Sequence, residues 1–499
     1  MRIKGLLTVI VLISLSFSNF AQQQAYFKAW VDAGDSAIKK SNFYGAHQAY
    51  KKALEIKDDE HVAWKAAEAC RMYQNYPKAE GFYRQVISRD SSRYPKAYFW
   101  YAEMLKMQGK YKQAEKAFGE YFKANKNTKD YFSFRSKHEM SICKDGVYDV
   151  DTIRDIRLSR VDGINTTYSE LGAYIYQDSI MYFSSVRPIQ GDSNSYFSKI
   201  YKSVKRNNSW TKPEVLPDVI NTPMTDVANL VFSKDNKTVY FNKCLRLEQY
   251  MCDIYEATYE NGKFKNVKKL PEIINAVGSS TSQPHLAITP EGEYLFFSSD
   301  RKGSIKISDP VNKTEFYTKD IWYAKKNKDG SWGKPQNCGK KVNTYGSEVT
   351  PFYDVRDSTL YFSSEFHNSL GGYDVFKTKG NISKNEWNIP VNVGRPVNSS
   401  YNDIYFTYGK DSVVAYFTSN RPESMRFFDE AHGNDIYSYE MVKKAITKIL
   451  ELVPITLYFD NDQPNPKTRD TVTTENYEDL LYNYLAQKEE YIKWNTKGV

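Results

Sequence analysis

A unit that recurs five times in the middle of the chain limits the possible fold more than any other feature. Each copy contains two adjacent aromatic residues in an apolar stretch, and these pairs begin at Tyr182, Tyr240, Phe296, Tyr361 and Tyr416, at intervals of 58, 56, 65 and 55 residues. A second apolar segment of the form DIY follows in each unit, starting at Lys199, Asp253, Asp320, Asp374 and Asp435. An IN or VN pair then opens the next unit, at Ile220, Ile274, Val342 and Val397. Short apolar runs separated by turn residues predict four strands per unit.

Sheets of four short strands bury both faces when they pack in a ring. The units resemble the WD40-like (PD40) propeller repeats of the translocation protein TolB, which implies a five-bladed β-propeller over residues 153–441. The fifth unit lacks its last strand, whereas Arg157–Thr166 matches the end of the first unit, Pro213–Thr222. We therefore expect residues 155–161 to supply the missing outer strand and to cover an edge that would otherwise pair with other chains.

Polar residues follow each aromatic pair. We interpret these residues, together with the later Asp that four of the units contain, as turn and strand-end chemistry. The alternative is a binding rim made of polar loops such as Ser419–Asp435. The chain has five cysteines, and Cys244 and Cys252 flank a predicted hairpin loop, where a disulfide would form if the two strands pair. Cys70 and Cys143 lie in helical patterns and are expected to be buried apolar residues.

A second kind of repeat occupies residues 25–146. Ala46, Ala79 and Ala114 are 33 and 35 residues apart, and Tyr50, Tyr83 and Phe118 keep the same intervals. This period resembles the tetratricopeptide repeat (TPR), an α-solenoid of paired helices. The alanines let two helices approach, the aromatic residues fill the gap to the next pair, and a helix near 131–144 caps the array. The resemblance implies a concave surface for a protein or peptide, with Trp64, Lys65 and Tyr101 as candidate contacts; the alternative places these side chains in the core between repeats.

The first 21 residues have the pattern of a signal peptide, with Arg2 and Lys4 before an apolar run from Leu6 to Phe17. No cysteine stands directly after this run, so we do not expect a lipoprotein. No later segment is apolar enough to cross a membrane. We therefore expect an exported protein of the periplasm.

The C-terminal part changes character after a linker at 442–453. Residues 454–499 resemble the opening of the OmpA-like C-terminal domain, which binds peptidoglycan, but the motifs that hold peptidoglycan in that family have no counterpart in the chain. The predicted fold class is thus α + β multidomain: a TPR solenoid, a five-bladed propeller and an incomplete OmpA-like α/β tail. This order of segments resembles the PorE-like, OmpA-family envelope proteins of Bacteroidota, which are linked to type IX secretion and gliding. The resemblance implies outer-membrane or secretion proteins as partners, and peptidoglycan only if the missing OmpA-like half is supplied.

Several other function classes lack support in the sequence. The net charge of +9 is dispersed along 499 residues, whereas nucleic-acid binding needs a concentrated basic stripe. The chain has no G-x-S-x-G motif, no pair of histidines at metal spacing and no glycine-rich phosphate loop, so we predict no catalytic, cofactor or metal residues. The 41 tyrosines suit both strands and contact surfaces. We expect a non-catalytic periplasmic scaffold associated with the outer membrane; the alternative is a glycan-binding or glycan-cleaving propeller.

Overall fold

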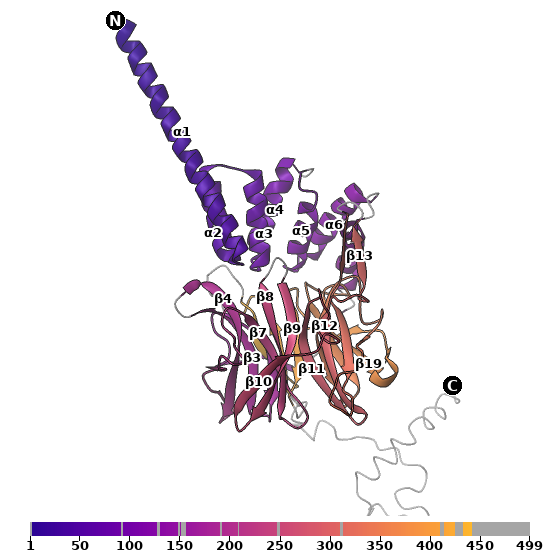
Figure 1. Cartoon of the computed structure of the whole chain (residues 1–499). Helices are drawn as coiled ribbons and strands as arrows, with labels where there is room; N and C mark the ends of the chain where they lie inside the picture. Colours follow the sequence, from indigo (N-terminus) through magenta and orange to yellow (C-terminus); the bar gives the residue numbers. More distant parts are fainter. Residues whose placement is uncertain are drawn as a thin grey trace, which may run out of the picture. The chain divides into compact units, whose positions relative to one another are not determined.

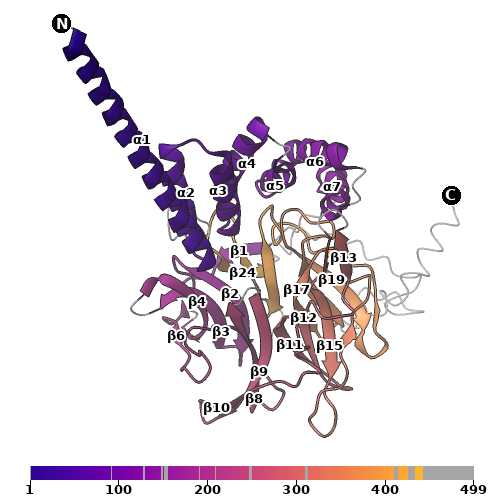
Figure 2. The ribbon, with the colours of Figure 1, turned by 45° about the horizontal axis from the view of Figure 1, so that its top comes forward.

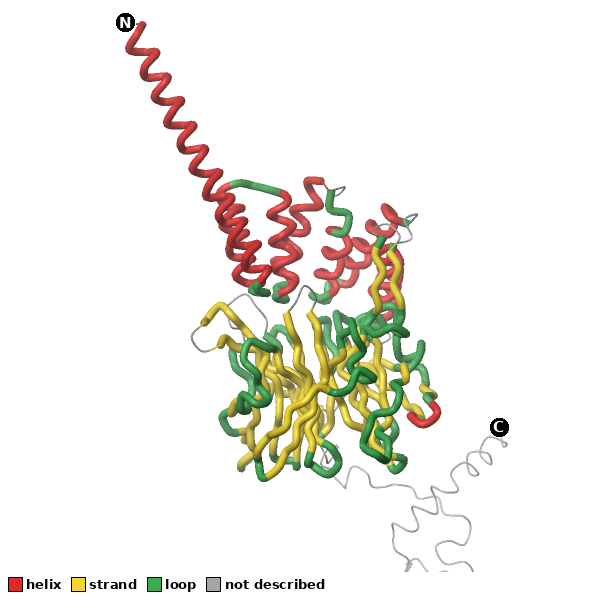
Figure 3. The backbone as a smooth tube through the Cα atoms, in the orientation of Figure 1, coloured by secondary structure: helices red, strands yellow, loops and turns green. Residues whose placement is uncertain are grey.

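The computed structural model describes residues 2–441, apart from stretches at 91–92, 127–129, 148–149, 151–155, 190–191, 208, 247–249, 310–312, 410–413 and 425–432. In this part of the chain an array of paired helices precedes a five-bladed β-propeller, as predicted (Figures 1 and 3). The predicted linker at 442–453, the OmpA-like segment at 454–499 and most of the loop between Ser419 and Asp435 lie outside the described residues.

The helical array consists of three hairpins and a final helix that ends in a π-turn. Its elements are α1 (Arg2–Lys39), α2 (Phe43–Ile56), α3 (Glu60–Met72), α4 (Tyr76–Asp90), α5 (Ala97–Lys106), α6 (Tyr111–Asn125), α7 (Tyr131–Ser141) and η1 (Ile142–Gly146). The repeated alanines and aromatic residues all lie in α2, α4 and α6, and each is at most 1% exposed. The predicted packing role of these residues is therefore confirmed. No helix in the described residues is both long and apolar enough to span a membrane.

Each blade is an antiparallel sheet. Blade 1 contains β2 (Ser169–Tyr176), β3 (Ile180–Ile189), β4 (Asp192–Arg206), β5 (Ser209–Trp210) and β6 (Glu214–Val215), and blade 2 contains β7 (Asp226–Phe232), β8 (Thr238–Arg246), β9 (Tyr250–Glu260) and β10 (Lys263–Lys269). Blade 3 contains β11 (Thr281–Thr289), β12 (Gly292–Ser299), β15 (Asp320–Lys325) and β16 (Gln336–Asn337), with an inserted hairpin of β13 (Lys306–Asp309) and β14 (Thr314–Tyr317).

The last two blades complete the ring. Blade 4 contains β17 (Glu348–Asp354), β18 (Thr359–Ser364), β19 (Asp374–Asn381), the 3-10 turn η2 (Ile382–Lys384), β20 (Glu386–Trp387) and β21 (Val391–Asn392). Blade 5 contains β22 (Asp403–Tyr408), β23 (Val414–Ser419), β24 (Asp435–Met441) and, as its outer strand, β1 (Ile156–Arg160). The predicted closure is confirmed, because β1 pairs with β24 and places Leu158 opposite Tyr439 (Figure 2).

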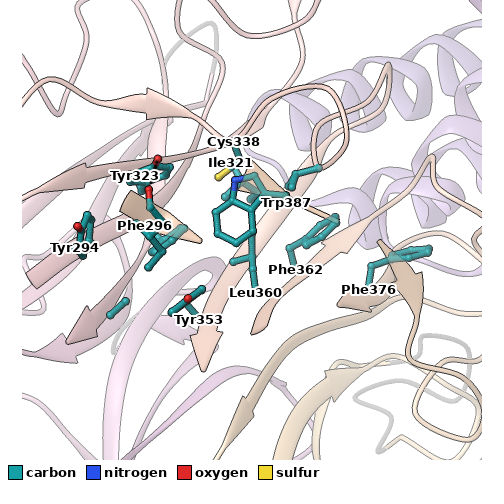
Figure 4. Packing of buried hydrophobic residues seen from close by; sticks show 13 residues of the cluster. Tyr294, Phe296, Ile321, Tyr323, Cys338, Tyr353, Leu360, Phe362, Phe376 and Trp387 are labelled. Atoms are coloured by element: carbon teal, nitrogen blue, oxygen red, sulfur yellow. Dashed lines mark hydrogen bonds between the residues drawn. The ribbon is translucent and has the colours of Figure 1, made fainter. Parts of the chain in front are cut away.

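The recurring aromatic pair explains how the blades hold one another. Successive side chains of a strand point to opposite faces of its sheet. The first member of each pair packs against the following blade, and the second packs against the preceding one: Phe296 joins the cluster between blades 3 and 4, and Phe297 joins the cluster between blades 2 and 3. Figure 4 shows the first of these clusters, in which Phe296 lies between Tyr323 and Tyr353. Five such clusters, one for each pair of neighbouring blades, make a continuous apolar ring.

A buried asparagine clamps the start of every blade to the one before it. In the first such clamp along the ring, the Asn221 Oδ1 atom accepts a hydrogen bond from Ile200 N at 2.9 Å, and its Nδ2 atom donates to Ile200 O at 2.9 Å. The same pair of bonds joins Asn275 to Ile254, Asn343 to Ile321, Asn398 to Val375 and Asn165 to Ile436. The IN and VN pairs of the sequence are thus the clamps, and the Asn165 clamp reinforces the closure.

The polar residues after each aromatic pair differ in part from the expected turn chemistry. Each inner strand contains a bulge with positive φ, at Gly172, Asn229, Gln283, Thr350 and Tyr405. In blade 4 the first polar residue after the pair, Ser363, bonds to Thr350 of its own blade. In the other four blades this residue bonds across to the next blade; for example, Ser184 Oγ accepts from Asn229 N, and Thr418 Oγ1 accepts from Gly172 N, both at 3.2 Å. This residue therefore joins blades around the axis, where the remaining cavity is only about 60 Å³.

We predict that Asn275→Ala lowers the free energy of unfolding by about 2–3 kcal/mol, because it leaves Ile254 N and Leu270 O unpaired in a buried site and removes one of the two hydrogen bonds to Ile254 O. The control is Asn388→Ala at an exposed position. Chemical denaturation of both variants measures the difference, and equal stability of the two variants would contradict the clamp.

Candidate functional site

The helical array meets the propeller through the turns of its second and third hairpins. We call the end of the propeller at which the inner strands β2, β7, β11, β17 and β22 begin the helix-facing end. Tyr76, next to the α3–α4 turn, is 3% exposed, and its hydroxyl bonds to Asn402 Nδ2 at 3.0 Å and to Asn420 Nδ2 at 2.7 Å. Gly109, in the α5–α6 turn, lies against Ser400. Both contacts fall on blade 5 or on the connection that leads into it.

A buried charge network joins α5 and α7 to blade 4. Lys106 Nζ lies 2.6 Å from Glu139 Oε2, and both side chains are fully buried. The Arg135 guanidinium lies 3.5 Å from carboxylate oxygens of Glu103, Glu139 and Glu365, of which Glu365 belongs to blade 4. Burial raises the pKa of Glu103 to about 7, although the positive charge of Arg135 acts in the opposite direction.

Apolar and aromatic contacts extend this junction. The rings of His138 and Phe366 stack with centroids 4.1 Å apart, and Leu370 packs in a buried cluster with Ile142 and Val147. Arg395 donates to the carbonyl oxygen of Val147 at 3.2 Å. The helices therefore cover the helix-facing end over blades 4 and 5.

A cleft of about 580 Å³ lies on the other half of this end, between the helices and blades 1 to 3. Lys40, Asn42 and Phe43 of the α1–α2 turn, with Met72 at the end of α3, form its helical wall. The propeller wall comes mainly from blades 1 and 2 and includes Leu171, Val186, Tyr196, Asp226, Arg246 and Tyr250, with Lys319 of blade 3 and Tyr405 of blade 5. Its volume falls within the range of about 300–1,000 Å³ that ligand sites occupy.

A disulfide and an ion pair shape the propeller wall. Cys244 and Cys252, the predicted candidate pair, are opposite one another in β8 and β9 and are linked by a disulfide. Arg246 Nε lies 2.8 Å from Asp226 Oδ2, and Asp226 Oδ1 also accepts from Ser198 N at 2.7 Å. The carboxylate of Asp226 is therefore neutralised within the wall.

Two lysines line the cleft without such a partner. Among the described residues, no side-chain hydrogen bond or ion pair is formed by Lys40 or Lys319. Burial lowers the pKa of Lys319, while the charges of Asp300 and Glu365 act in the opposite direction. Both carboxylates lie beyond the 4.0 Å of an ion pair, and Glu365 is engaged by Arg135. The described wall of the cleft thus has a net positive charge.

Two more lysines lie beside the cleft, on strands whose neighbouring residues line it. Lys199 Nζ donates to the carbonyl oxygen of Thr225 at 2.7 Å, and Lys243 Nζ donates to the hydroxyl of Thr222 at 2.6 Å. Burial lowers the pKa of both lysines, and neither forms an ion pair with a described carboxylate. These lysines add to the positive charge of the same half.

The carboxylates at the first or second position of four inner strands are each engaged by nearby donors. Glu348 accepts hydrogen bonds from Thr344 N at 2.7 Å and from Ser364 Oγ at 2.7 Å. Asp403 accepts from Ser399 N at 2.7 Å and pairs with Arg421 at 2.6 Å. Glu170 and Asp226 are bound in a similar way. Within the described residues no group of three or more His, Cys, Asp or Glu is arranged to hold a metal ion.

The predicted helical contacts lie apart from the cleft. Trp64 stacks on Tyr94 with ring centroids 5.2 Å apart, and Lys65 Nζ lies 2.8 Å from Asp35 Oδ1. Tyr101 is half-buried between two clusters of the helical core. None of the three lines the cleft.

Reasoning from the sequence missed the residues that do line the cleft, except for the two cysteines. One signal pointed towards them: Lys199 stands where the other four units have Asp, and Lys243 stands where the other four have Ser. Both departures from the repeat belong to blades 1 and 2.

We predict that Tyr76→Phe weakens the junction by about 1–2 kcal/mol, because the buried amide of Asn420 and the half-buried amide of Asn402 lose their shared partner. Limited proteolysis should cut the variant faster between the helices and the propeller, at 147–156. The control Tyr26→Phe changes an exposed tyrosine and should leave the cutting rate unchanged; an unchanged rate for Tyr76→Phe would contradict the prediction.

A second prediction concerns Asp374, which is fully buried under the helices. Burial, reinforced by the charge of Asp403, raises its pKa to about 7. The folded state therefore binds a proton more tightly than the unfolded state, and stability falls as the pH rises from about 4 to 7. Between pH 5 and pH 8, Asp374→Asn should lose about 2 kcal/mol less stability than the natural chain. Urea denaturation at both pH values tests this, and parallel losses in the two proteins would refute it.

No protein-family model matches the chain, and no curated protein matches its sequence. Solved structures resemble it at low identity. A thermostable family-43 glycoside hydrolase is 13% identical, with a TM-score of 0.37, over 56% of this chain and 92% of that one. An α-L-arabinofuranosidase from Lactobacillus brevis is 9% identical with a TM-score of 0.36, and an endo-arabinase from Bacteroides thetaiotaomicron is 14% identical with a TM-score of 0.35; both cover 56% of this chain, and 92% and 95% of their own. These likenesses concern the propeller fold and carry no conclusion about activity.

Proposed function

We propose that the chain is a non-catalytic scaffold that binds other proteins through its helical array and the helix-facing end of its propeller. The observation that carries this proposal is the half of that end which the helices leave uncovered. Large apolar side chains are exposed there on the β8–β9 hairpin and on the connections into blades 2 and 3: Val219, Met224, Leu245, Tyr250, Ile273 and Val277, at 41% to 80%. Exposed apolar groups gathered in one region are typical of protein contact sites.

The state of the carboxylates supports binding rather than catalysis. Hydrolysis of a glycosidic bond uses two carboxyl groups that face the substrate from opposite sides. Here Glu170, Asp226, Glu348 and Asp403 are at most 4% exposed. Each accepts hydrogen bonds from its own blade or from the connection that leads into it, and Asp226 also accepts one from Ser198 N of blade 1. Their chemistry is that of turns and strand ends.

The proposed setting is the bacterial envelope. The N-terminal segment has the pattern of a signal peptide, and the Cys244–Cys252 disulfide is typical of an oxidising compartment. The helical repeat resembles the TPR, and the order of segments resembles the PorE-like envelope proteins. On this basis the proposed location is the periplasm next to the outer membrane, with outer-membrane, secretion or gliding proteins as partners. Contact with peptidoglycan would require a complete OmpA-like domain.

Photocrosslinking in the producing cells tests this function. A benzophenone amino acid in place of Tyr250 lies on the uncovered half, and one in place of Asn261 lies in an exposed turn at the opposite end of blade 2. We expect a discrete protein adduct from position 250 and none from position 261. Adducts with glycan alone, or release of sugar from envelope polysaccharide by the purified chain, would favour the alternative of a glycan-active propeller.

A further inference from the structure

We propose that the cleft binds an acidic segment of a partner protein, with carboxylates next to Lys40 and Lys319 and an apolar side chain between Met72 and the tyrosines of the propeller wall. This inference rests on the proposed function and names the chemistry of the partner. It rests on the charge of the cleft, on the form of its walls and on the pattern of the repeats.

The charge of the cleft is the first argument. Four lysines lie in or beside it, and none forms an ion pair with a described carboxylate, whereas the acidic group of the wall, Asp226, is bound by Arg246 at 2.8 Å. An uncompensated positive site attracts a negative partner and speeds its association. Lys319 is half-buried, so a carboxylate beside it would be less screened by water than at an open surface.

The walls supply the apolar part of the site. Met72 is 48% exposed and Tyr250 is 52% exposed, and they lie on opposite walls of the same cleft. Methionine adapts to varied partners, and tyrosine offers a large contact area with few rotatable bonds. The disulfide holds β8 to β9 on this wall, so the cleft is bounded by a constrained hairpin.

The repeats themselves show that this half departs from what the fold requires. Blades 3, 4 and 5 have Ser299, Ser364 and Ser419 paired with Asp320, Asp374 and Asp435. Blade 1 pairs Ser185 with Lys199, and blade 2 pairs Lys243 with Asp253. Three blades form without a lysine at these positions, so the two lysines are not needed to build a blade.

Binding of labelled peptides tests the proposal. The probes are three fluorescein-labelled hexapeptides that contain the same Phe and Leu residues, alternating with Asp and Glu, with Asn and Gln, or with Lys. Fluorescence anisotropy with the full purified chain should show binding of the acidic peptide, at least tenfold weaker binding of the neutral one, and weaker affinity as salt is raised.

Three variants locate the site. Lys319→Glu and Lys40→Glu should each weaken binding of the acidic peptide about tenfold or more, because each reverses a charge at the wall. Lys328→Glu reverses an exposed charge in a turn at the opposite end of the propeller and should leave the affinity unchanged. Circular dichroism melts of each variant establish that it is folded before its affinity is compared.

The outcomes are distinct. Equal binding of the three peptides, or an affinity that Lys319→Glu and Lys40→Glu do not change in folded protein, would overturn the inference. If the crosslink from position 250 persists in the Lys319→Glu chain, the scaffold function is supported and the binding of an acidic segment in the cleft is contradicted. If the acidic peptide binds as expected but no protein is crosslinked in cells, binding of acidic segments in the cleft is supported and the proposed scaffold function is contradicted.

Discussion

The asparagine clamp is the interaction on which the rest of this propeller depends. A blade ends with a short outer strand, and the chain must then cross to the next inner strand through an irregular connection. Each clamp satisfies both backbone groups of one buried residue, such as Ile254, and fixes where that connection passes. Because the same asparagine sits at the start of every blade, the inner strands all begin at one level, and this level becomes the helix-facing end.

Polar groups of the clamp and apolar groups of the aromatic pair both hold neighbouring blades together, in different ways. The aromatic pair packs each blade against both neighbours, but apolar contacts alone tolerate sliding of one sheet past another. The clamps and the bonds to the inner-strand bulges are directional, so they set the register of the ring. Both kinds of contact occur where the ring closes between blades 5 and 1. There β1 pairs with β24, Asn165 clamps Ile436, and Phe183 packs against blade 5.

Much of this fold was predictable because repetition reveals positions that matter in every copy. The number of blades and the alanine register of the helices followed from spacing, and the strand that closes the ring followed from the match of Arg157–Thr166 to Pro213–Thr222. The role of the first polar residue after each aromatic pair did not, because a Ser at a strand end and a Ser that bonds to the next blade look alike in one sequence. The junction was also hidden: nothing near Tyr76 indicates that its hydroxyl meets Asn402 and Asn420, more than 320 residues away. Trp64, Lys65 and Tyr101 followed from the general form of helical arrays, whereas the cleft combines a helical turn with strand residues of the propeller and depends on how the array meets the propeller.

The position of the helices gives the five nearly equivalent blades different roles. Where α5 and α7 cover blades 4 and 5, the buried groups are complementary: Lys106 meets Glu139, and Arg135 meets Glu365. Where the helices leave blades 1 and 2 open, the repeat changes to lysine and to exposed apolar side chains, and a disulfide holds the hairpin that presents them. A repeated scaffold can meet the needs of stability and of binding with different residues. The residues that all five blades share hold the ring together, and the residues that differ between blades can serve binding. Residues that differ from the repeat, and that the other blades do without, are therefore the best candidates for a function.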